Sequence, residues 1–437
     1  NHGGHLLGER QPFVVWLNLS QRAGRVNPMN ERLGTPRAGR AARQVSLRQH
    51  NLGLALRHIL DAPHPLSRAD IALATGLTRA TVSALVDRLI AAHLVAELEP
   101  VAAQRAGRPA VPLVPATGTV AAVGMEVNVD YLGVRAVDLA GRVLSEHVEP
   151  GDFRGSEPGP VLDRLAALAG PVVAVLSADG VAVVGTALAL PGLVDSVTGP
   201  LRVAPNLGWR DVDVVGLLTA HPVLAAVPPR LANEANLAAR AEAHVRRRTG
   251  PSSFVYVSGE VGIGGAIVLD GEIFTGRHGW SGEIGHIALG TAGSFDEGGT
   301  LEAFAGQDAI LDHAGLPRST TVAELVARAD VGEELAVAAL ARAGAALGVV
   351  LAGVVNVVDV EHVVLGGIYA DLADHLRAHV TEQLRRRVIA APWSRVDVDV
   401  ARAGKYPAMT GGALSVLELL VEDPAAWVGE EPGTTTA

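Results

Sequence analysis

The stretch from Val257 to Glu302 holds the side chains best suited to polar ligand chemistry. Within it, Glu283 and His286 lie three residues apart, and each follows a glycine, Gly282 or Gly285. The glycines predict that the backbone approaches a ligand closely while both side chains face it. A carboxylate accepts hydrogen bonds and an imidazole both donates and accepts them, which suits a polyhydroxylated ligand. The alternative for this stretch alone is a glycine-rich surface loop with a solvated Glu and His.

Size and composition limit the kind of molecule that holds these residues. For 437 residues with 49% hydrophobic content we expect two or three domains. The longest apolar run, Ala343 to Val355, is shorter than the roughly 18 residues of a membrane-spanning helix, and no secretory signal pattern is present. The absence of cysteine excludes disulfides and cysteine-ligated zinc. We therefore expect a cytoplasmic protein with no membrane partner.

The net charge of -10 is unevenly distributed along the chain. Residues 1–115 hold 14 Arg and 7 Asp or Glu, a charge of +7, which leaves 22 basic and 39 acidic residues, a charge of -17, for the rest. A basic N-terminal part on an acidic body indicates a nucleic-acid-binding module. Residues 1–44 show no sustained hydrophobic period, and we interpret them as a flexible basic extension.

Three helical patterns follow between residues 45 and 115. The first has apolar residues at helical spacing from Leu52 to Leu60 and ends in a proline-containing break. Ser67 and Asp70 then form a start signal for a short helix that stops at a glycine. Thr78 caps a third helix, whose apolar face runs from Val82 to Ile90.

Two helices joined by a glycine-containing turn, the second with short polar and Arg side chains near its start, are typical of a major-groove reader. The segment Arg105–Pro109 places two arginines around a glycine, which allows close approach to a narrow groove and indicates a wing. The alternative is an ordinary three-helix bundle with a solvated polar face.

The run SRADIALATGLTRATVSALVDRLIAAHLV, followed by AGRP, resembles the winged helix-turn-helix of repressors in the ROK family of repressors, open reading frames and kinases. The resemblance implies an all-α winged helix-turn-helix domain at residues 45–115 that binds operator DNA through the helix Thr78–His93. We predict base-edge contacts for three residues near the start of this helix, phosphate contacts for two arginines, and wing contacts for two more. The predicted DNA-binding set is Arg68, Thr78, Arg79, Thr81, Ser83, Arg88, Arg105 and Arg108.

Residues 116–437 alternate strand and helix patterns, which predicts an α/β body. Five motifs occur there in order: PGLVD, APNLGW, NEAN, SGEIGH and LE. In this order they resemble the sugar-kinase and repressor domain of the ROK family, which implies a two-lobed actin-like ATPase fold with a sugar pocket between the lobes. The sugar contacts implied by the resemblance are Asn206, Asn233, Glu234, Glu283, His286 and Glu302. Such a dense array of donors and acceptors discriminates between sugar epimers, because a missing hydroxyl leaves buried polar groups unpaired.

Two departures from the kinase members of the family bear on phosphoryl transfer. Where those kinases carry a glycine-rich phosphate loop, this chain reads Gly124-Met-Glu-Val-Asn-Val-Asp130, and Glu126 and Asp130 repel a polyanion. Glu234 stands in place of the Asp general base, and its longer arm shifts the carboxylate within the site.

A third departure concerns zinc. Gly293, Phe295 and Thr300 stand roughly where many family members have zinc-binding cysteines. We therefore expect no metal and no other cofactor, and His286 is available for the ligand.

These features favour a sugar-responsive transcriptional regulator, a repressor that binds a palindromic operator as a homodimer or homotetramer and has a small sugar as effector. The main alternative is an active ATP-dependent sugar kinase with a DNA-binding head. A third is a regulator that has lost its ligand and responds to a protein partner.

Overall fold

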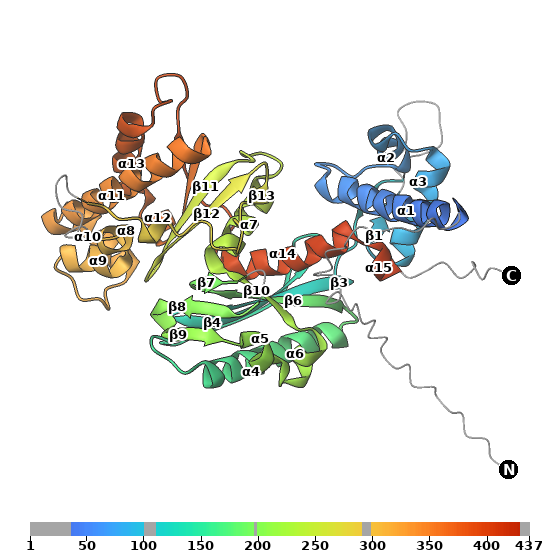
Figure 1. The fold of residues 1–437 in the computed structure, drawn as a ribbon, viewed down its shortest axis with the longest axis horizontal. Coiled ribbons are helices and arrows are strands. Elements are labelled where there is room, and N and C mark those ends of the chain that lie inside the picture. The colour runs from blue at the N-terminus through green and yellow to red at the C-terminus, as the bar shows by residue number, and fades with distance from the viewer. Residues whose placement is uncertain (1–35, 100–110, 196–198, 291–298, 429–437) are drawn as a thin grey trace, which may run out of the picture. The chain divides into compact units, whose positions relative to one another are not determined.

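The computed structural model describes residues 36–99, 111–195, 199–290 and 299–428, and for residues 36–46 the backbone alone. The chain divides into two compact units, coloured along the chain in Figure 1. The first unit comprises the residues up to Val120, together with Gly180–Val184 and the residues from Leu419 on. The second comprises Ala121–Asp179 and Gly185–Glu418.

Three helices build the first unit: α1 (Pro36–Asp61), α2 (Arg68–Thr75) and α3 (Arg79–Ala91). Ser67 and Asp70 form the predicted capping box of α2, which ends at Gly76 in the left-handed conformation, with φ of 72°. The Thr78 side chain caps α3 by accepting from the backbone N–H of Thr81. The apolar faces of all three helices meet in one core, formed by Leu52, Leu56, Ile59, Ile71, Val82, Leu85, Val86 and Leu89.

Helix α1 is longer than the sequence pattern indicates. It begins at Pro36, inside the segment that we predicted as a flexible extension, whereas the apolar periodicity starts only at Leu52. A hydrophobic pattern predicts only the part of a helix that packs on a core, and it does not show solvent-facing helical turns before that part.

Two short strands follow the three helices. β1 (Val95–Glu97) pairs antiparallel with β2 (Leu113–Pro115), and Leu66 forms a bridge to Leu113 at the start of β2. The C-terminal helix α15 (Ala425–Val428) packs against α1 and α3. A three-helix core with an antiparallel strand pair is the arrangement of a winged helix-turn-helix.

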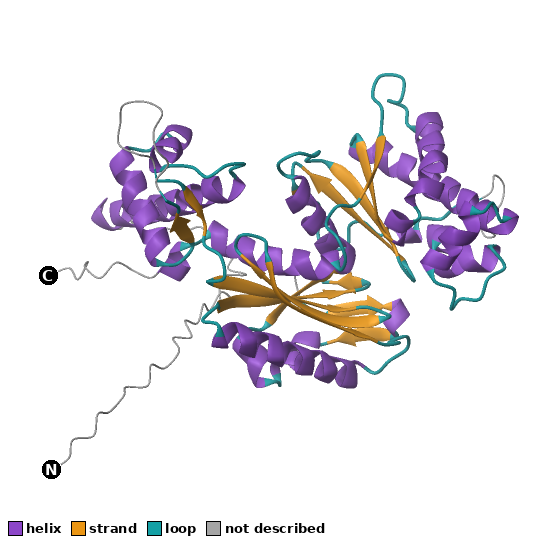
Figure 2. Ribbon diagram, turned by 180° about the vertical axis from the view of Figure 1, so that it is seen from behind, coloured by secondary structure: helices purple, strands orange, loops and turns teal. Residues whose placement is uncertain are grey.

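The second unit contains two five-stranded sheets, the first in the order β10-β6-β3-β4-β5. Its strands β3, β4 and β5 form an antiparallel meander. Helices α4, α5 and α6 lie along one face of this sheet, as Figure 2 shows from behind. The elements are β3 (Val120–Val127), β4 (Tyr131–Asp138), β5 (Val143–Pro150), α4 (Pro158–Ala178), β6 (Ala182–Leu190), α5 (Val214–Thr219), α6 (Pro222–Ala226) and β10 (Pro229–Asn233), with a small three-stranded sheet of β7 (Leu193–Val194), β8 (Leu201–Ala204) and β9 (Trp209–Val212).

The second sheet has the order β13-β12-β11-β14-β15. β11 pairs antiparallel with β12 and parallel with β14, so the sheet is mixed. Its strands are β11 (Phe254–Gly259), β12 (Ile263–Leu269), β13 (Glu272–Ile273), β14 (His362–Gly367) and β15 (Asp397–Val400). The helices of this part are α7 (Glu234–Arg246), α8 (Leu301–Ala305), α9 (Gln307–His313), α10 (Val322–Asp330), α11 (Glu334–Val358), α12 (Ile368–Asp371), α13 (Ala373–Arg387) and α14 (Pro407–Glu422).

Helices α4 and α11 are each long and apolar enough, by length and composition alone, to cross a membrane. The prediction that no segment reaches this length is therefore wrong, because it considered uninterrupted apolar runs and not whole helices. Both helices pack within the second unit: α11 against α13, α8, α9 and α10, and α4 against β4, β5, α5 and α6. Their apolar residues are those of helices that cover sheets and other helices.

Candidate functional site

All six residues predicted to contact a polar ligand line one pocket in the second unit. They come from four separate segments of the chain: the turn after β8, the junction of β10 and α7, the 3-10 helix η3 (Ile284–His286), and the start of α8. The residues are Asn206, Asn233, Glu234, Glu283, His286 and Glu302. The geometry brings the set together, while the contact of each residue with a sugar stays a prediction.

Asn233 has a structural task in this pocket that the sequence did not reveal. Its Oδ1 accepts from the backbone N–H groups of Ala235 at 2.9 Å and Asn236 at 3.2 Å, which caps α7. Its Nδ2 donates to the carbonyl oxygen of Gly192 at 3.0 Å. Three of the four hydrogen-bonding positions of the amide are thus used within the protein. Asn233 therefore positions the start of α7, and with it Glu234, relative to the turn at Gly192.

Asn206 and Glu302 approach the same point of the β11–β12 turn. A Cβ added to Gly262 would lie 3.0 Å from Asn206 Nδ2 and 3.3 Å from Glu302 Oε2. The backbone N–H of Ile263 donates to Glu302 Oε2 at 3.4 Å. A side chain at this position would push the amide or the carboxylate aside by a few tenths of an ångström, so the glycine keeps both close to this wall of the pocket.

Gly282 and Gly285 serve a different purpose from the one predicted. A Cβ on Gly282, whose φ is 99°, would lie 2.3 Å from the carbonyl oxygen of Gly265, and a Cβ on Gly285 would lie 2.4 Å from that of Ile263. Both glycines therefore allow the segment to press against β12. The prediction that they bring the backbone to a ligand is wrong, and their role is to hold the segment that carries the pocket's acid and imidazole.

Glu283 and His286 project from this segment into the pocket. Burial raises the pKa of Glu283, the nearby His286 lowers it, and Glu302 raises it. His286 is exposed. The pair offers a carboxyl group that accepts from hydroxyls and an imidazole that both donates and accepts.

A larger cavity of about 540 Å³ adjoins the pocket and shares Glu234 and Gly262 with it. Its walls contain Glu126, Glu260 and Asn128. Asn128 Nδ2 donates to Glu260 Oε2 at 2.6 Å and to Glu126 Oε1 at 3.3 Å, so one amide links two carboxyl groups that are 134 positions apart in the chain.

Three carboxyl groups of this cavity have raised pKa values, which favours their neutral forms. Burial, with repulsion from Glu260, raises the pKa of Glu126 to about 8. Burial raises the pKa of Glu260 to about 7, against the hydrogen bond from Asn128 that lowers it. Burial and the charges of Glu260, Glu126 and Glu283 raise the pKa of Glu234 well above its ordinary value. Desolvation and like charge act in the same direction here.

Tyr406, in the wall of this cavity, has a backbone conformation that is uncommon for a residue with a side chain. Its φ is 54°, and it immediately precedes the first residue of α14. The Tyr131 ring packs edge-on against its ring, with centroids 5.0 Å apart. Arg135 Nη1 donates to its carbonyl oxygen at 3.2 Å, and the guanidinium lies over its ring. These contacts offset a backbone cost of about 1–3 kcal/mol.

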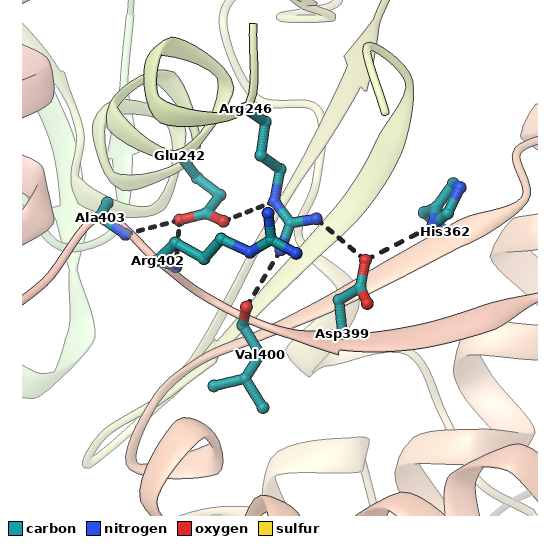
Figure 3. Close-up of polar contacts among 7 residues, drawn as sticks. All are labelled: Glu242, Arg246, His362, Asp399, Val400, Arg402 and Ala403. Carbon is teal, nitrogen blue, oxygen red and sulfur yellow. Dashed lines mark hydrogen bonds and ion pairs between the residues drawn. The ribbon is translucent and has the colours of Figure 1, made fainter. Parts of the chain in front are cut away.

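A buried ionic network fixes the far end of α7, the helix that begins at Glu234 (Figure 3). Arg246 donates to Glu242 at 2.5 Å and to Asp399 at 2.9 Å. Glu242 Oε2 also accepts from the backbone N–H groups of Arg402 at 2.7 Å and Ala403 at 2.8 Å. Ala401 and Ala403 line the cavity, so the network holds one of its walls. Sequence motifs gave no sign of it, because its members are far apart in the chain.

No cluster of three or more His, Asp or Glu side chains is arranged to hold a metal ion in the part of the chain that the structure describes. Thr300, at one predicted cysteine-equivalent position, is the residue before α8. Gly293 and Phe295 lie outside the described residues. The expectation of no metal therefore stays a prediction.

In the first unit, the predicted DNA-binding residues differ in their surroundings. Thr78 and Arg79 are exposed, and Thr81, Ser83 and Arg88 are half-buried. The hydroxyl of Thr78 caps α3, so its task within the protein is established and its contact with DNA is a prediction. Arg105 and Arg108 lie outside the described residues.

Arg68 differs from Arg88, the other predicted phosphate contact, because two carboxylates already hold it. Its guanidinium pairs with Asp87 at 2.7 Å and with Glu97. Hydrogen bonds and charge from these partners raise its pKa, although burial opposes this. Arg68 thus joins α2, α3 and β1, and a phosphate would compete with both carboxylates for it.

Comparison with known proteins gives the same two-part organisation. A model described as ROK family matches residues 134–418, and one described as MarR family matches residues 53–106. The chain is 25% identical over 396 residues to a putative xylose repressor of Caldicellulosiruptor sp. strain Rt8B.4. This alignment covers 86% of this chain and 98% of that relative.

Two solved structures extend the comparison to the fold. A ROK family transcriptional regulator, a homologue of the E. coli MLC protein, is 26% identical and has a TM-score of 0.73, with 87% of this chain and 99% of that chain covered. A ROK hexokinase from Thermus thermophilus is 28% identical and has a TM-score of 0.55, with 68% of this chain and 99% of that chain covered. The predicted fold class, a winged helix-turn-helix followed by a two-lobed α/β body, is confirmed.

Proposed function

Because the chain belongs to the ROK family, we propose that it is a sugar-responsive transcriptional repressor whose second unit binds the effector sugar and whose first unit binds operator DNA. The observation that carries the proposal is the meeting of six predicted sugar contacts, drawn from four segments, in one pocket of a chain that also has a capped α2–α3 pair. The relatives named as repressors support the same assignment.

The pocket recognises a sugar through complementary hydrogen bonds. Asn206 offers an amide that donates and accepts, and Glu302 offers an oxygen that accepts from a hydroxyl. His286 and Glu283 contact a further pair of hydroxyls. Since each position of the sugar ring meets a group of fixed donor or acceptor character, an epimer leaves one buried group unpaired and binds more weakly.

In the first unit, α3 enters the major groove, with Arg79, Thr81 and Ser83 at base edges and Arg88 on phosphate. Thr78 sets the orientation of α3 by capping it. Arg105 and Arg108 contact DNA from the wing. A palindromic operator calls for a homodimer or homotetramer, and a repressor of this kind works in the cytoplasm without a membrane partner. Sugar binding shifts the population of the second unit toward a state in which operator affinity is low.

Two properties of the cavity next to the pocket weigh against the kinase alternative. The carboxyl groups of Glu126 and Glu260 line the place where a phosphate loop would be needed, and they repel phosphate when ionised. Burial and the charges of Glu260 and Glu126 raise the pKa of Glu234, which stands in the position of a general base, and this disfavours the ionised form that would take a proton. The similarity to a ROK hexokinase keeps the kinase as the second candidate.

Titration of labelled operator DNA with glucose, N-acetylglucosamine and xylose tests the proposal. One sugar is expected to lower operator affinity, and Glu283→Ala is expected to abolish that response while Glu272→Ala, at an exposed carboxylate of β13, leaves it intact. If no sugar changes operator affinity, the effector role is wrong. A coupled ATP assay with the same sugars separates the alternatives: turnover that Glu234→Gln abolishes identifies a kinase.

A further inference from the structure

The large cavity beside the sugar pocket has the size of a small-molecule site and a one-sided charge. Its volume of about 540 Å³ falls in the range of ligand pockets, roughly 300–1,000 Å³. Five carboxyl groups and one cation line it: Glu126, Asp130, Glu234, Glu260, Asp371 and Lys405. Lys405 is exposed, so it does not neutralise the buried carboxyl groups.

Two carboxyl oxygens in the wall are buried without a partner of regular geometry. Among the residues that the structure describes, Glu234 Oε2 is shielded from solvent and has no hydrogen-bond partner. Glu126 Oε2 is also shielded and has no partner of regular geometry, although hydrogen bonding from Tyr131 and Asn128 lowers the pKa of Glu126 against the larger effect of burial. Glu126 as a residue is only 2% exposed. An unpaired buried carboxyl group lowers stability, and a glutamine or an apolar side chain would remove the charge. Groups of this kind that line a cavity are candidates for ligand contacts.

The sign of the charge selects the class of ligand. Burial and neighbouring carboxyl groups both raise the pKa of Glu126 and of Glu234, and a positive charge placed among them favours their ionised forms instead. A phosphate or carboxylate ligand would add to the repulsion. The described carboxyl groups are not arranged as ligands of a metal ion. An ammonium group, which donates up to three hydrogen bonds, suits oxygens that lack donors.

We propose that this cavity is a second binding site, distinct from the sugar pocket, for a small organic cation that carries a protonated amine. The ammonium group pairs with the carboxylates of Glu126 and Glu234, and Glu260, which shares the Asn128 amide with Glu126, adds its charge beside them. Because Glu234 lines both sites, it is the group through which a bound cation changes sugar binding. If the chain is the sugar-responsive repressor proposed above, the amine is a second effector beside the sugar.

Calorimetry on the full chain tests the proposal with two probes of equal length, putrescine and 1,4-butanediol. Putrescine is expected to bind one site and to release protons at pH 7, which titration in two buffers of different ionisation enthalpy measures. The diol, which has no charge, is expected to give no binding. Glu126→Gln and Glu260→Gln are each expected to weaken putrescine binding about tenfold or more, since each removes a negative charge from beside the ammonium group.

The controls separate a built site from general attraction to an acidic protein. Glu334→Gln, at an exposed carboxylate at the start of α11, is expected to leave putrescine binding unchanged. Asp130→Asn, at an exposed position of the cavity wall, provides a second variant if a buried substitution prevents folding. The proposal is wrong if the diol binds as well as the diamine, or if the cavity variants bind putrescine like the wild type. It is also wrong if MgATP binds and those variants abolish its binding.

Discussion

Asn128 Nδ2 lies 2.6 Å from Glu260 Oε2, a contact that joins the β3–β4 turn of the first sheet to the β11–β12 turn of the second sheet. The same amide also donates to Glu126 Oε1. One side chain therefore moderates the repulsion between two buried carboxyl groups that no local motif relates.

Asn128→Leu is expected to lower the free energy of unfolding by about 1–3 kcal/mol, because Glu260 Oε2 loses its donor while buried. Chemical denaturation of the purified chain measures this loss. In a Glu260→Gln background the same substitution should cost less, since the group left behind is uncharged. Equal costs in both backgrounds would show that the two residues are not coupled.

Stability is expected to fall as pH rises from about 6 to 8, on the order of 2 kcal/mol from Glu126 alone. The pKa of Glu126 is about 8 in the folded chain, against an ordinary value of 4.5. In this window the folded state holds a proton that the unfolded state has lost, so raising the pH favours unfolding. Denaturation at several pH values checks this: Glu126→Gln should flatten the decline, and an unchanged slope would contradict the assigned shift.

Asn233→Ala is expected to cost about 1 kcal/mol through the lost cap of α7 and also to weaken sugar binding, because α7 carries Glu234 into the pocket. Thr321→Ala is the matched control. It removes a cap of similar worth from α10, which lies away from the pocket residues. Thermal shift with and without sugar separates the two: only Asn233→Ala should reduce the shift.

Arg246→Ala is expected to destabilise the second unit by about 3–5 kcal/mol, because Glu242 and Asp399 would keep their charges without the buried partner (Figure 3). Urea denaturation measures the change. Arg385→Ala, which breaks an exposed pair with Glu382 on α13, should leave the midpoint unchanged. A small effect at Arg246 would mean that solvent reaches the network.

Arg79→Ala is expected to weaken operator binding by about tenfold and to relax sequence preference, as for a base-edge contact. Arg68→Ala is expected to act mainly on stability, by about 1 kcal/mol or less, since Asp87 and Glu97 hold its guanidinium. Binding isotherms at two salt concentrations distinguish these roles, with Arg57→Ala on the exposed face of α1 as the control. If Arg68→Ala reduces the dependence of operator affinity on salt by about the amount of one phosphate contact, our structural assignment of Arg68 is wrong.

The sequence predicted those features whose cause lies within a few residues. Ser67 with Asp70, and Thr78 with Thr81, are capping relationships inside one helical turn, and the structure has both. The six pocket residues were found because each sits in a short motif with a recognisable family resemblance, although the motifs are scattered along the chain.

Features that depend on distant partners could not be predicted in the same way. Arg246 meets Asp399 only because α7 packs beside β15, and nothing in either segment specifies the other. The roles of Gly282 and Gly285 were misjudged for the same reason: the atoms that exclude a side chain belong to β12. The motif around Asn233 predicted a ligand contact, which stays a prediction, but it gave no sign of the hydrogen bond that the side chain donates to the carbonyl oxygen of Gly192.

The backbone conformation of Tyr406 sets the direction in which α14 begins. The φ of Tyr406 is 54°, outside the negative range that is usual for a residue with a side chain. A change of this angle to the usual range would rotate the peptide that joins Tyr406 to Pro407, and with it the direction of α14. The ring contact with Tyr131 and the hydrogen bond from Arg135 oppose that rotation. The entry into the 16-residue helix α14 therefore depends on two side chains of β4, Tyr131 and Arg135, and not on residues of α14 itself.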